Sequence, residues 1–467
     1  IADFDKAIEI KPDDYSAWYS RGVALNHLEK YEDEVASLNK AIEIKPDEYD
    51  AWYKRGLALF NLEEYEDTVT SWNKAIEIKP DEYIAWVQRG IVLCYIFRQY
   101  NDAITSLNKA IEIKHDDYSA WYSRGVALNQ LEKYEDAVAS LYKAIEIKPD
   151  EYIAWHNRGI VLCKLRRYED AVASYDKAIE IKPDEYNTWY EQGIALRNLE
   201  KYEDAVASLN KAIEIKPDDY NTWNSLGAVL CDNLCRYKEA ITSFDEALRL
   251  TENQYWLAWN NKGMALLKSQ GYKAAIETWD NGIKALKPDN PNYEENCGKL
   301  HHQKGEIFYE YATKESEPFT NWFAAKTSYE KALTFFTFEK FPQLNLQVLQ
   351  ELLQVCSTLG DESAFQKYIE AAAQRLEKMV AECDTQGKKI TLERRYAAFN
   401  QLRVDIKLQS KDANKEIAAL ELAEKRKNTC LGWLQENWDY QPPKITYQDI
   451  QKLLNPKMAA IFWHISP

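Results

Sequence analysis

The stretch "AIEIKPDEYDAWYKRG", from Ala41 to Gly56, decides the fold because the chain repeats it with few changes. Residues 75–90 read "AIEIKPDEYIAWVQRG", and residues 144–159 read "AIEIKPDEYIAWHNRG". Its tryptophan recurs at intervals of 34 to 36 residues, and a glycine lies four positions after each of these tryptophans. A fixed period of this size indicates a repeat protein. The tryptophans are Trp18, Trp52, Trp86, Trp121, Trp155, Trp189, Trp223 and Trp259.

Each repeat is predicted to hold two helices. Trp18, Gly22 and Leu25 are spaced i, i+4, i+7 and so share one face of a first helix. A second helix repeats this spacing with Glu34, Leu38 and Ala41, and later copies replace the glutamate with alanine. The small residues predict a close approach of the two helices, with the tryptophan and the leucine filling the space beside them.

The connection between repeats is predicted from "KPDE" at residues 45–48. Pro46 ends the second helix because proline cannot continue it. Asp47 and Glu48 then lie where the next first helix begins, which suits its N-cap and its dipole. Since one helix pair cannot bury its apolar face alone, successive pairs are expected to stack into a solenoid.

Trp18, Gly22, Ala41 and Pro46 at these offsets resemble the tetratricopeptide repeat (TPR) over about residues 1–291. The resemblance implies an all-α fold, a right-handed superhelical solenoid whose first helices line a concave trough. The chain departs from many such repeats at the position before the glycine, where it carries an arginine. We expect its alkyl stem to pack between helices and its head to pair with an acidic neighbour, with direct ligand contact as the alternative. These residues are Arg21, Arg55, Arg89, Arg124 and Arg158.

The composition favours a protein partner. The formal net charge is −16, spread along the repeats, which argues against direct nucleic-acid binding because that needs clustered Lys and Arg. The sequence shows no apolar run long enough to span a membrane and no signal peptide. Its 8 cysteines are scattered rather than arranged as a disulfide framework, so we expect a reducing cytoplasm.

The chain is predicted to divide into five segments. Residues 1–14 align with the second helix of a repeat, which suggests that further repeats precede Ile1. Eight TPR repeats follow in 15–291 and degenerate TPR-like helical pairs in 292–382, with helices near Leu344–Thr358 and Glu362–Glu382. A helical hairpin is expected in 383–434, with helices near 392–409 and 412–433. Residues 435–467 then read as a linker and one orphan β-strand, from Met458 to Ile465.

Residues 445–467, joined to TPRs, resemble the entry to a CHAT domain, a caspase-like peptidase domain found after bacterial TPR arrays. The resemblance implies a first strand here and a Cys–His dyad, where one is kept, beyond Pro467. The chain would then be the docking arm of a cysteine peptidase or of an inactive relative.

The chain itself is predicted to be non-enzymatic, with no catalytic residue, cofactor or metal. His464 is followed by no cysteine and is assigned a structural role. His301 and His302, near Cys297, point about 100° apart on a helix, so joint metal ligation is awkward. Cys231 and Cys235 lack further ligands, and phosphate-loop, nucleophile-elbow and HExxH motifs are missing.

A partner is predicted to bind in the concave trough, on residues one, five and eight positions after each tryptophan. The tyrosines and aliphatic residues among them suit an extended peptide or a partner helix, although some could merely pad the next repeat. The predicted residues are Tyr19, Val23, Asn26, Tyr53, Leu57, Phe60, Val87, Ile91, Tyr122, Val126, Asn129, His156, Ile160, Tyr190, Ile194, Arg197 and Asn224. A basic–Asn clamp for a C-terminal carboxylate is missing. One insertion, in "LCYIFRQY" at residues 93–100, leaves Phe97 either protruding or tucked between helices.

Three functions follow from these observations. The first is a protein-binding arm that regulates a C-terminal caspase-like domain, with an intramolecular contact as a further partner. The second is a stand-alone TPR scaffold or chaperone-like adaptor without a peptidase. The third is an arm joined to a different enzyme, such as a transferase.

Overall fold

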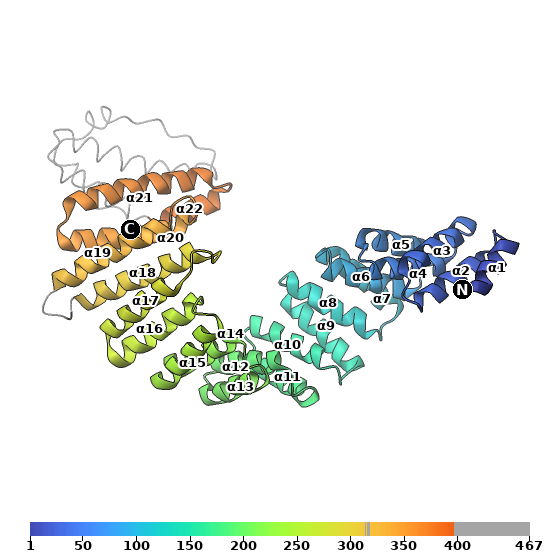
Figure 1. Cartoon of the computed structure of the whole chain (residues 1–467), viewed down its shortest axis with the longest axis horizontal. Helices are drawn as coiled ribbons and strands as arrows, with labels where there is room; N and C mark the ends of the chain where they lie inside the picture. The colour runs from blue at the N-terminus through green and yellow to red at the C-terminus, as the bar shows by residue number, and fades with distance from the viewer. Residues whose placement is uncertain (313, 315–317, 397–467) are drawn as a thin grey trace, which may run out of the picture. The chain divides into compact units, whose positions relative to one another are not determined.

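The fold is given by a computed structural model that describes residues 1–312, 314 and 318–396. Every regular element of these residues is an α-helix. The chain forms two compact units, Ile1–Cys235 and the residues from Arg236 onward. Within each unit, consecutive helices pack side by side as the repeat period predicts (Figure 1). None of the described helices is long and apolar enough to cross a membrane.

The helices of the repeats alternate in length and composition. After α1 (Ala2–Ile10), the first helices of the repeats, which carry the tryptophan and the glycine, are α2 (Tyr15–Asn26), α4 (Tyr49–Asn61), α6 (Tyr83–Tyr95), α8 (Tyr118–Gln130), α10 (Tyr152–Lys164), α12 (Tyr186–Asn198), α14 (Tyr220–Asp232) and α16 (Trp256–Gln270). The second helices are α3 (Tyr31–Ile44), α5 (Tyr65–Ile78), α7 (Tyr100–Ile113), α9 (Tyr134–Ile147), α11 (Tyr168–Ile181), α13 (Tyr202–Ile215), α15 (Tyr237–Leu250) and α17 (Tyr272–Ala285).

The C-terminal unit continues with longer helices. These are α18 (Tyr293–Ala312), α19 (Pro318–Phe335), α20 (Pro342–Leu359), α21 (Glu362–Glu382) and α22 (Gln386–Arg395). The helices predicted near 344–358 and 362–382 are therefore present as α20 and α21. Helix α22 begins at Gln386 and overlaps only the first residues of the helix predicted near 392–409, and most of that helix lies outside the described residues. Thr385 accepts a hydrogen bond from the Lys388 amide at 3.5 Å and so favours this earlier start. The rest of the predicted hairpin, the linker, the orphan strand and His464 lie outside the described residues.

Close contact between paired helices depends on the glycine of each first helix. A Cβ atom on Gly22 would lie 3.0 Å from Leu38 Cγ, and one on Gly56 would lie 2.3 Å from Trp72 Nε1. Leu38 and Trp72 are fully buried. The small residue of the second helix likewise makes room for the tryptophan of the first helix. A Cβ atom on Gly282, for example, would lie 2.8 Å from Trp259 Cγ. The predicted pairing of small and large residues is therefore confirmed.

The repeated tryptophan has a second role that the spacing did not predict. Its indole Nε1–H donates to the backbone carbonyl six residues earlier, in the turn that precedes its helix, at 2.7 to 3.1 Å. The acceptor is usually the turn proline, such as Pro46, but it is His115 in one repeat and Asn253 in another. Because the bond uses a backbone oxygen, it survives the loss of the proline. Each tryptophan thus ties the turn between repeats to the start of a first helix.

The insertion at residues 93–100 is accommodated by a wider turn. The Gln99 amide donates to the Leu93 carbonyl at 2.8 Å, whereas the matching bond in the next repeat, from Lys133 to Leu128, closes a shorter loop. Phe97 packs against a buried cluster that includes Leu93 and Ala103. The insertion is therefore tucked between helices, and Phe97 does not protrude.

Candidate partner-binding face

The predicted trough residues belong to first helices that contact one another along the N-terminal unit. Contacts join α2 to α4, α6 to α8, α8 to α10, α10 to α12 and α12 to α14. We call the predicted residues on these helices the first-helix stripe. It comprises Tyr19, Val23 and Asn26 (α2), Tyr53, Leu57 and Phe60 (α4), Val87 and Ile91 (α6), Tyr122, Val126 and Asn129 (α8), His156 and Ile160 (α10), Tyr190, Ile194 and Arg197 (α12), and Asn224 (α14).

Most of the first-helix stripe is partly open to solvent. Phe60 is the most exposed of its apolar members, at 37%. Val87 and Asn224 are exceptions, with exposures of 5% and 7%. Val87 is buried in a cluster with Leu107 and Ala120, so its side chain serves the packing of two repeats.

The aromatic members of the stripe make two kinds of contact. Tyr19 and Tyr53 stack on tyrosines of their own helices, Tyr15 and Tyr49, with ring centroids 5.7 and 5.8 Å apart. Tyr122 stacks in the same way on Tyr118, at 5.7 Å, and its hydroxyl also accepts a hydrogen bond from Asn157 of the next first helix at 3.1 Å.

The stripe residues of α10 and α12 also reach the following first helix. His156 Nδ1 lies 3.0 Å from the Thr188 hydroxyl, and the Tyr190 hydroxyl lies 3.3 Å from that of Ser225. Part of the stripe therefore packs against the neighbouring repeat, and this includes Tyr53, which packs on a cluster that holds Ala85 of α6. Unlike Tyr122 and Tyr190, Tyr19 and Tyr53 show no hydrogen bond from their hydroxyl groups to the next first helix among the described residues.

The tyrosine and histidine side chains of the stripe are held largely uncharged, and Arg197 is its one cationic member. Burial raises the pKa of the Tyr19, Tyr53 and Tyr122 phenols, which keeps them as neutral hydrogen-bonding groups. Burial also lowers the pKa of His156, an effect that Glu185 partly opposes. A neutral, amphipathic aromatic surface of this kind suits peptide backbone and apolar side chains.

The arginines before the glycines lie between helices, but their partner differs from the prediction. In four repeats the guanidinium Nη1 donates to a serine hydroxyl sixteen residues later, at 2.5 to 2.9 Å. The pairs are Arg21–Ser37, Arg55–Ser71, Arg124–Ser140 and Arg158–Ser174. Among these four, an acidic partner is found for Arg21 alone, which contacts Asp5 at 2.8 Å. The constant separation of sixteen residues in the sequence was the signal that could have revealed the serine.

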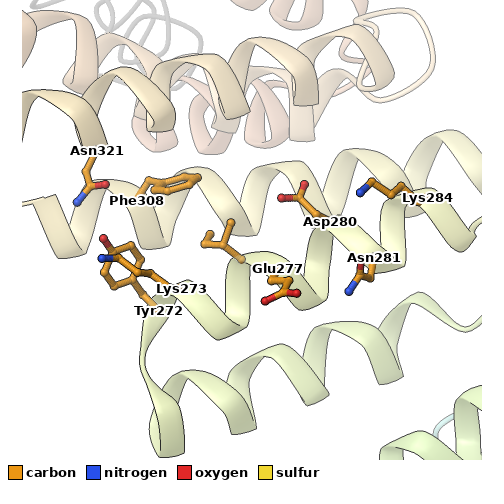
Figure 2. Close-up of a pocket in the computed structure, with 9 residues that line it drawn as sticks. Tyr272, Lys273, Glu277, Asp280, Asn281, Lys284, Phe308 and Asn321 are labelled. Carbon is orange, nitrogen blue, oxygen red and sulfur yellow. The ribbon is translucent and has the colours of Figure 1, made fainter.

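The C-terminal unit holds an open cavity that the sequence did not predict. Its volume is about 420 Å³, and it lies where α17 faces α18 and α19 (Figure 2). Figure 2 shows Tyr272 toward one end of the α17 face and Lys284 toward the other. Both charge signs are present, and Asp280 pairs with Lys304 of α18. The lining residues are Tyr272, Lys273, Ile276, Glu277, Asp280, Asn281, Lys284, Phe308 and Asn321.

The two adjacent histidines of α18 diverge as predicted. His301 is buried and stacks on Phe335, with ring centroids 5.7 Å apart, and burial lowers its pKa to about 4. His302 instead faces α20, where its Nε2 lies 2.6 Å from a Glu351 oxygen. They do not form a joint site with Cys297, which is buried.

Comparison with known families agrees with the geometry. Models described as tetratricopeptide repeat or TPR repeat match residues 1–49, 49–82, 118–151, 152–185, 193–233 and 234–291, which together span more than half of the chain. A model described as protein prenyltransferase alpha subunit repeat matches residues 100–131, which hold α7 and α8 of two consecutive repeats. No curated protein sequence matches the chain significantly.

Solved structures similar to the chain include several TPR proteins. YrrB, described as a TPR protein with an unusual peptide-binding site, is 24% identical with a TM-score of 0.37, over 40% of this chain and 95% of its own. MamA is 21% identical with a TM-score of 0.35, over 37% and 94%. A tetratricopeptide repeat protein of Parabacteroides merdae is 14% identical with a TM-score of 0.41, over 54% and 98%. On the family models and its own helix pairs, this chain belongs to the tetratricopeptide repeat proteins.

Proposed function

We propose that the N-terminal unit binds an extended peptide or a helix of a partner protein along the first-helix stripe. The observation that carries the proposal is the run of partly exposed, uncharged tyrosines and aliphatic residues on successive first helices. Stacked repeats present such residues at regular intervals, and this is how solenoids build long binding surfaces. Tyrosine offers a large contact area and a polar tip at a small entropic cost.

The N-terminal end of the stripe is the strongest part of the proposed site. Tyr19 and Tyr53 make no hydrogen bond to the next repeat through their side chains among the contacts described above, and Phe60 is exposed. Val87 and Asn224 are buried, so we expect them to shape the face rather than contact a partner. We therefore expect most binding energy to come from α2 and α4, with a smaller share from α8 and α12.

A pull-down from native cell extract tests the proposal with three versions of the chain. The first is the unchanged chain, the second carries Tyr19→Ala and Tyr53→Ala, and the third carries Tyr142→Ala. Tyr142 is a matched control because it is an exposed tyrosine, at 48%, on a second helix, α9. We expect a partner captured by the unchanged chain and by the control to be lost with the double variant. Equal capture by all three would place recognition elsewhere, and the α17 cavity would be the next surface to test.

We propose further that this interaction regulates a caspase-like domain in the same protein. The support is the resemblance of residues 445–467 to a CHAT entry, and these residues lie outside the described part of the chain. On this proposal residues 1–14 are the second helix of a repeat, and 15–291 hold eight repeats. Residues 292–382 hold degenerate pairs, 383–434 form a hairpin, and 435–467 are a linker and the first strand of the peptidase domain. The protein would act in the bacterial cytoplasm.

The regulatory proposal has its own test. A peptidase assay on the natural full-length protein, with and without the captured partner, should show cleavage that depends on the partner. Partner binding without any peptidase activity would favour the stand-alone scaffold. Activity of another chemical class would favour a different appended enzyme.

A further inference from the structure

One cluster in the C-terminal unit has a composition that packing alone does not require. Helix α18 places His302 and Glu306 one turn apart on the same face, because they are spaced i, i+4. Helix α20 brings Glu351 against them. One nitrogen and two carboxylate oxygens, each from a different residue, lie within 4.8 Å of one another.

The distances leave room for a single ion after small movements. His302 Nε2 lies 2.6 Å from Glu351 and 3.9 Å from Glu306. Ligand atoms bound to one tetrahedral Zn²⁺ ion lie about 3.3 Å apart, since each sits about 2.0 to 2.2 Å from the metal. The first distance would open and the second would close by less than about 1 Å, which side-chain rotations can supply. The ion would take the place of the hydrogen bond between the imidazole and Glu351.

The charge of the cluster also favours a cation. Among the described residues, the other groups that contact the two carboxylates are neutral. Gln303 donates to Glu306 at 2.6 Å, and Gln347 donates to Glu351 at 3.4 Å. Tyr329 is buried with its ring centroid 5.9 Å from that of His302, and its hydroxyl interacts with Glu351. Two carboxylates thus share one imidazole, and neither has a lysine or arginine partner among the ion pairs of the described chain.

The cluster is partly buried, but solvent can still reach its three side chains. The His302 side chain is 14% exposed, Glu351 is 25% exposed and Glu306 is 40% exposed. An ion could enter past Glu306 and lose most of its water on the side of His302. The two glutamines already hold the outer carboxylate oxygens, as supporting groups commonly do around metal ligands.

We propose that His302, Glu306 and Glu351 bind one divalent first-row transition-metal ion, with Zn²⁺ as the reference ion. An imidazole nitrogen with two carboxylates suits these metals, whereas Ca²⁺ and Mg²⁺ prefer ligands made only of oxygen. The ion would join α18 to α20 across the intervening helix α19 and so fasten the C-terminal unit. This proposal is independent of the first-helix stripe, which belongs to the other unit.

Isothermal titration of the metal-free full chain with ZnCl₂ tests the proposal. We expect one Zn²⁺ per chain, loss of that site in His302→Ala, and affinity lower by about 100-fold in Glu351→Gln. MgCl₂ should give no binding at this site. His115→Ala and Cys235→Ser should bind as the unchanged chain does, because these exposed side chains could ligate a metal but lie outside the cluster.

A spectroscopic readout keeps the proposal testable if a variant folds poorly. Co²⁺ bound by one nitrogen and carboxylate oxygens should show visible d–d absorption without the near-ultraviolet band of a thiolate ligand. Glu306→Gln keeps the shape of the side chain and should weaken this spectrum while leaving the helical circular dichroism unchanged. Zn²⁺ binding that is equal in His302→Ala and the unchanged chain, or no binding at all, would overturn the proposal and leave the cluster a hydrogen-bonded link between helices.

Discussion

At the scale of single residues, each helix pair depends on one glycine facing one large side chain. The large partner changes along the chain from Leu38 to Trp72 to Tyr175, while the glycine stays. The sequence predicted this close approach because a small and a large residue recur at fixed positions of the two helices, sixteen or seventeen residues apart. It did not predict how tight each contact would be, since that depends on the shape of the partner.

Gly56→Ala and Gly22→Ala should therefore differ in effect. An added Cβ on Gly56 would lie 2.3 Å from the Trp72 indole, which is rigid and fully buried, whereas on Gly22 it would meet Leu38 at 3.0 Å. Alanine gains about 1 kcal/mol in helix propensity at either position. We expect Gly56→Ala to lower the free energy of unfolding by about 1 to 3 kcal/mol and Gly22→Ala to be nearly neutral. Urea unfolding followed by circular dichroism measures both, and equal effects would contradict this account.

Glu34 is a buried carboxylate at a position where other repeats carry Thr68 or Ala137. One of its oxygens accepts from Asn26 at 2.9 Å, and the other has no hydrogen-bond partner among the described residues. Burial raises the pKa of Glu34. The folded state therefore holds this proton more tightly than the unfolded state, and stability falls as pH rises above the ordinary glutamate pKa of about 4.3.

Glu34→Ala should consequently stabilise the N-terminal unit, by about 1 kcal/mol at pH 7. The gain should shrink toward pH 4, where the unchanged chain carries a protonated Glu34. Thermal unfolding at several pH values measures the difference, with Glu32→Ala, an exposed neighbour on α3, as the control. A gain that stays constant with pH would show that the carboxylate charge is not its cause.

At the scale of helices and turns, each first helix of the N-terminal unit ends in a turn with a positive φ angle, which the sequence did not predict. A residue with positive φ follows the helix in every repeat of the N-terminal unit, and it is usually glutamate, as at Glu132 with φ of 59°. The next amide, of Lys133, donates back to the Leu128 carbonyl at 3.0 Å, as in a Schellman turn. Glycine is the usual residue at this position. Because glutamate stands there instead, the turn geometry could not be predicted from the sequence, although the helix bounds could.

Glu132→Gly should stabilise the chain because glycine adopts positive φ without steric cost. The expected gain is about 0.5 to 1 kcal/mol. Glu135→Gly, three residues later inside α9, should instead cost about 1 kcal/mol, because glycine is a poor helix former. The two variants make the same chemical change, so opposite shifts of the urea midpoint confirm the turn geometry. Shifts of the same sign would argue against it.

At the scale of the whole molecule, the repeat period predicted most of the helices, because one packing solution recurs in each copy. The candidate face was predictable only as a set of positions. How far a tyrosine there is free to contact a partner depends on the next first helix. Tyr19, Tyr53 and Tyr122 all stack within their own helices, but the Tyr122 hydroxyl also accepts a hydrogen bond from Asn157. The cluster of His302, Glu306 and Glu351 was missed because its third member lies 45 residues beyond Glu306 along the chain.

The central claim is that partners bind the first helices of the N-terminal unit rather than the second helices. Photo-crosslinking tests it most directly, with benzoylphenylalanine placed at Tyr53 in one chain and at Tyr142 in another, so that one aromatic ring replaces another. We predict a crosslink to the bound partner from position 53 and none from position 142. A crosslink from position 142 alone, with partner capture intact in both chains, would contradict the claim and place the binding face on the second helices.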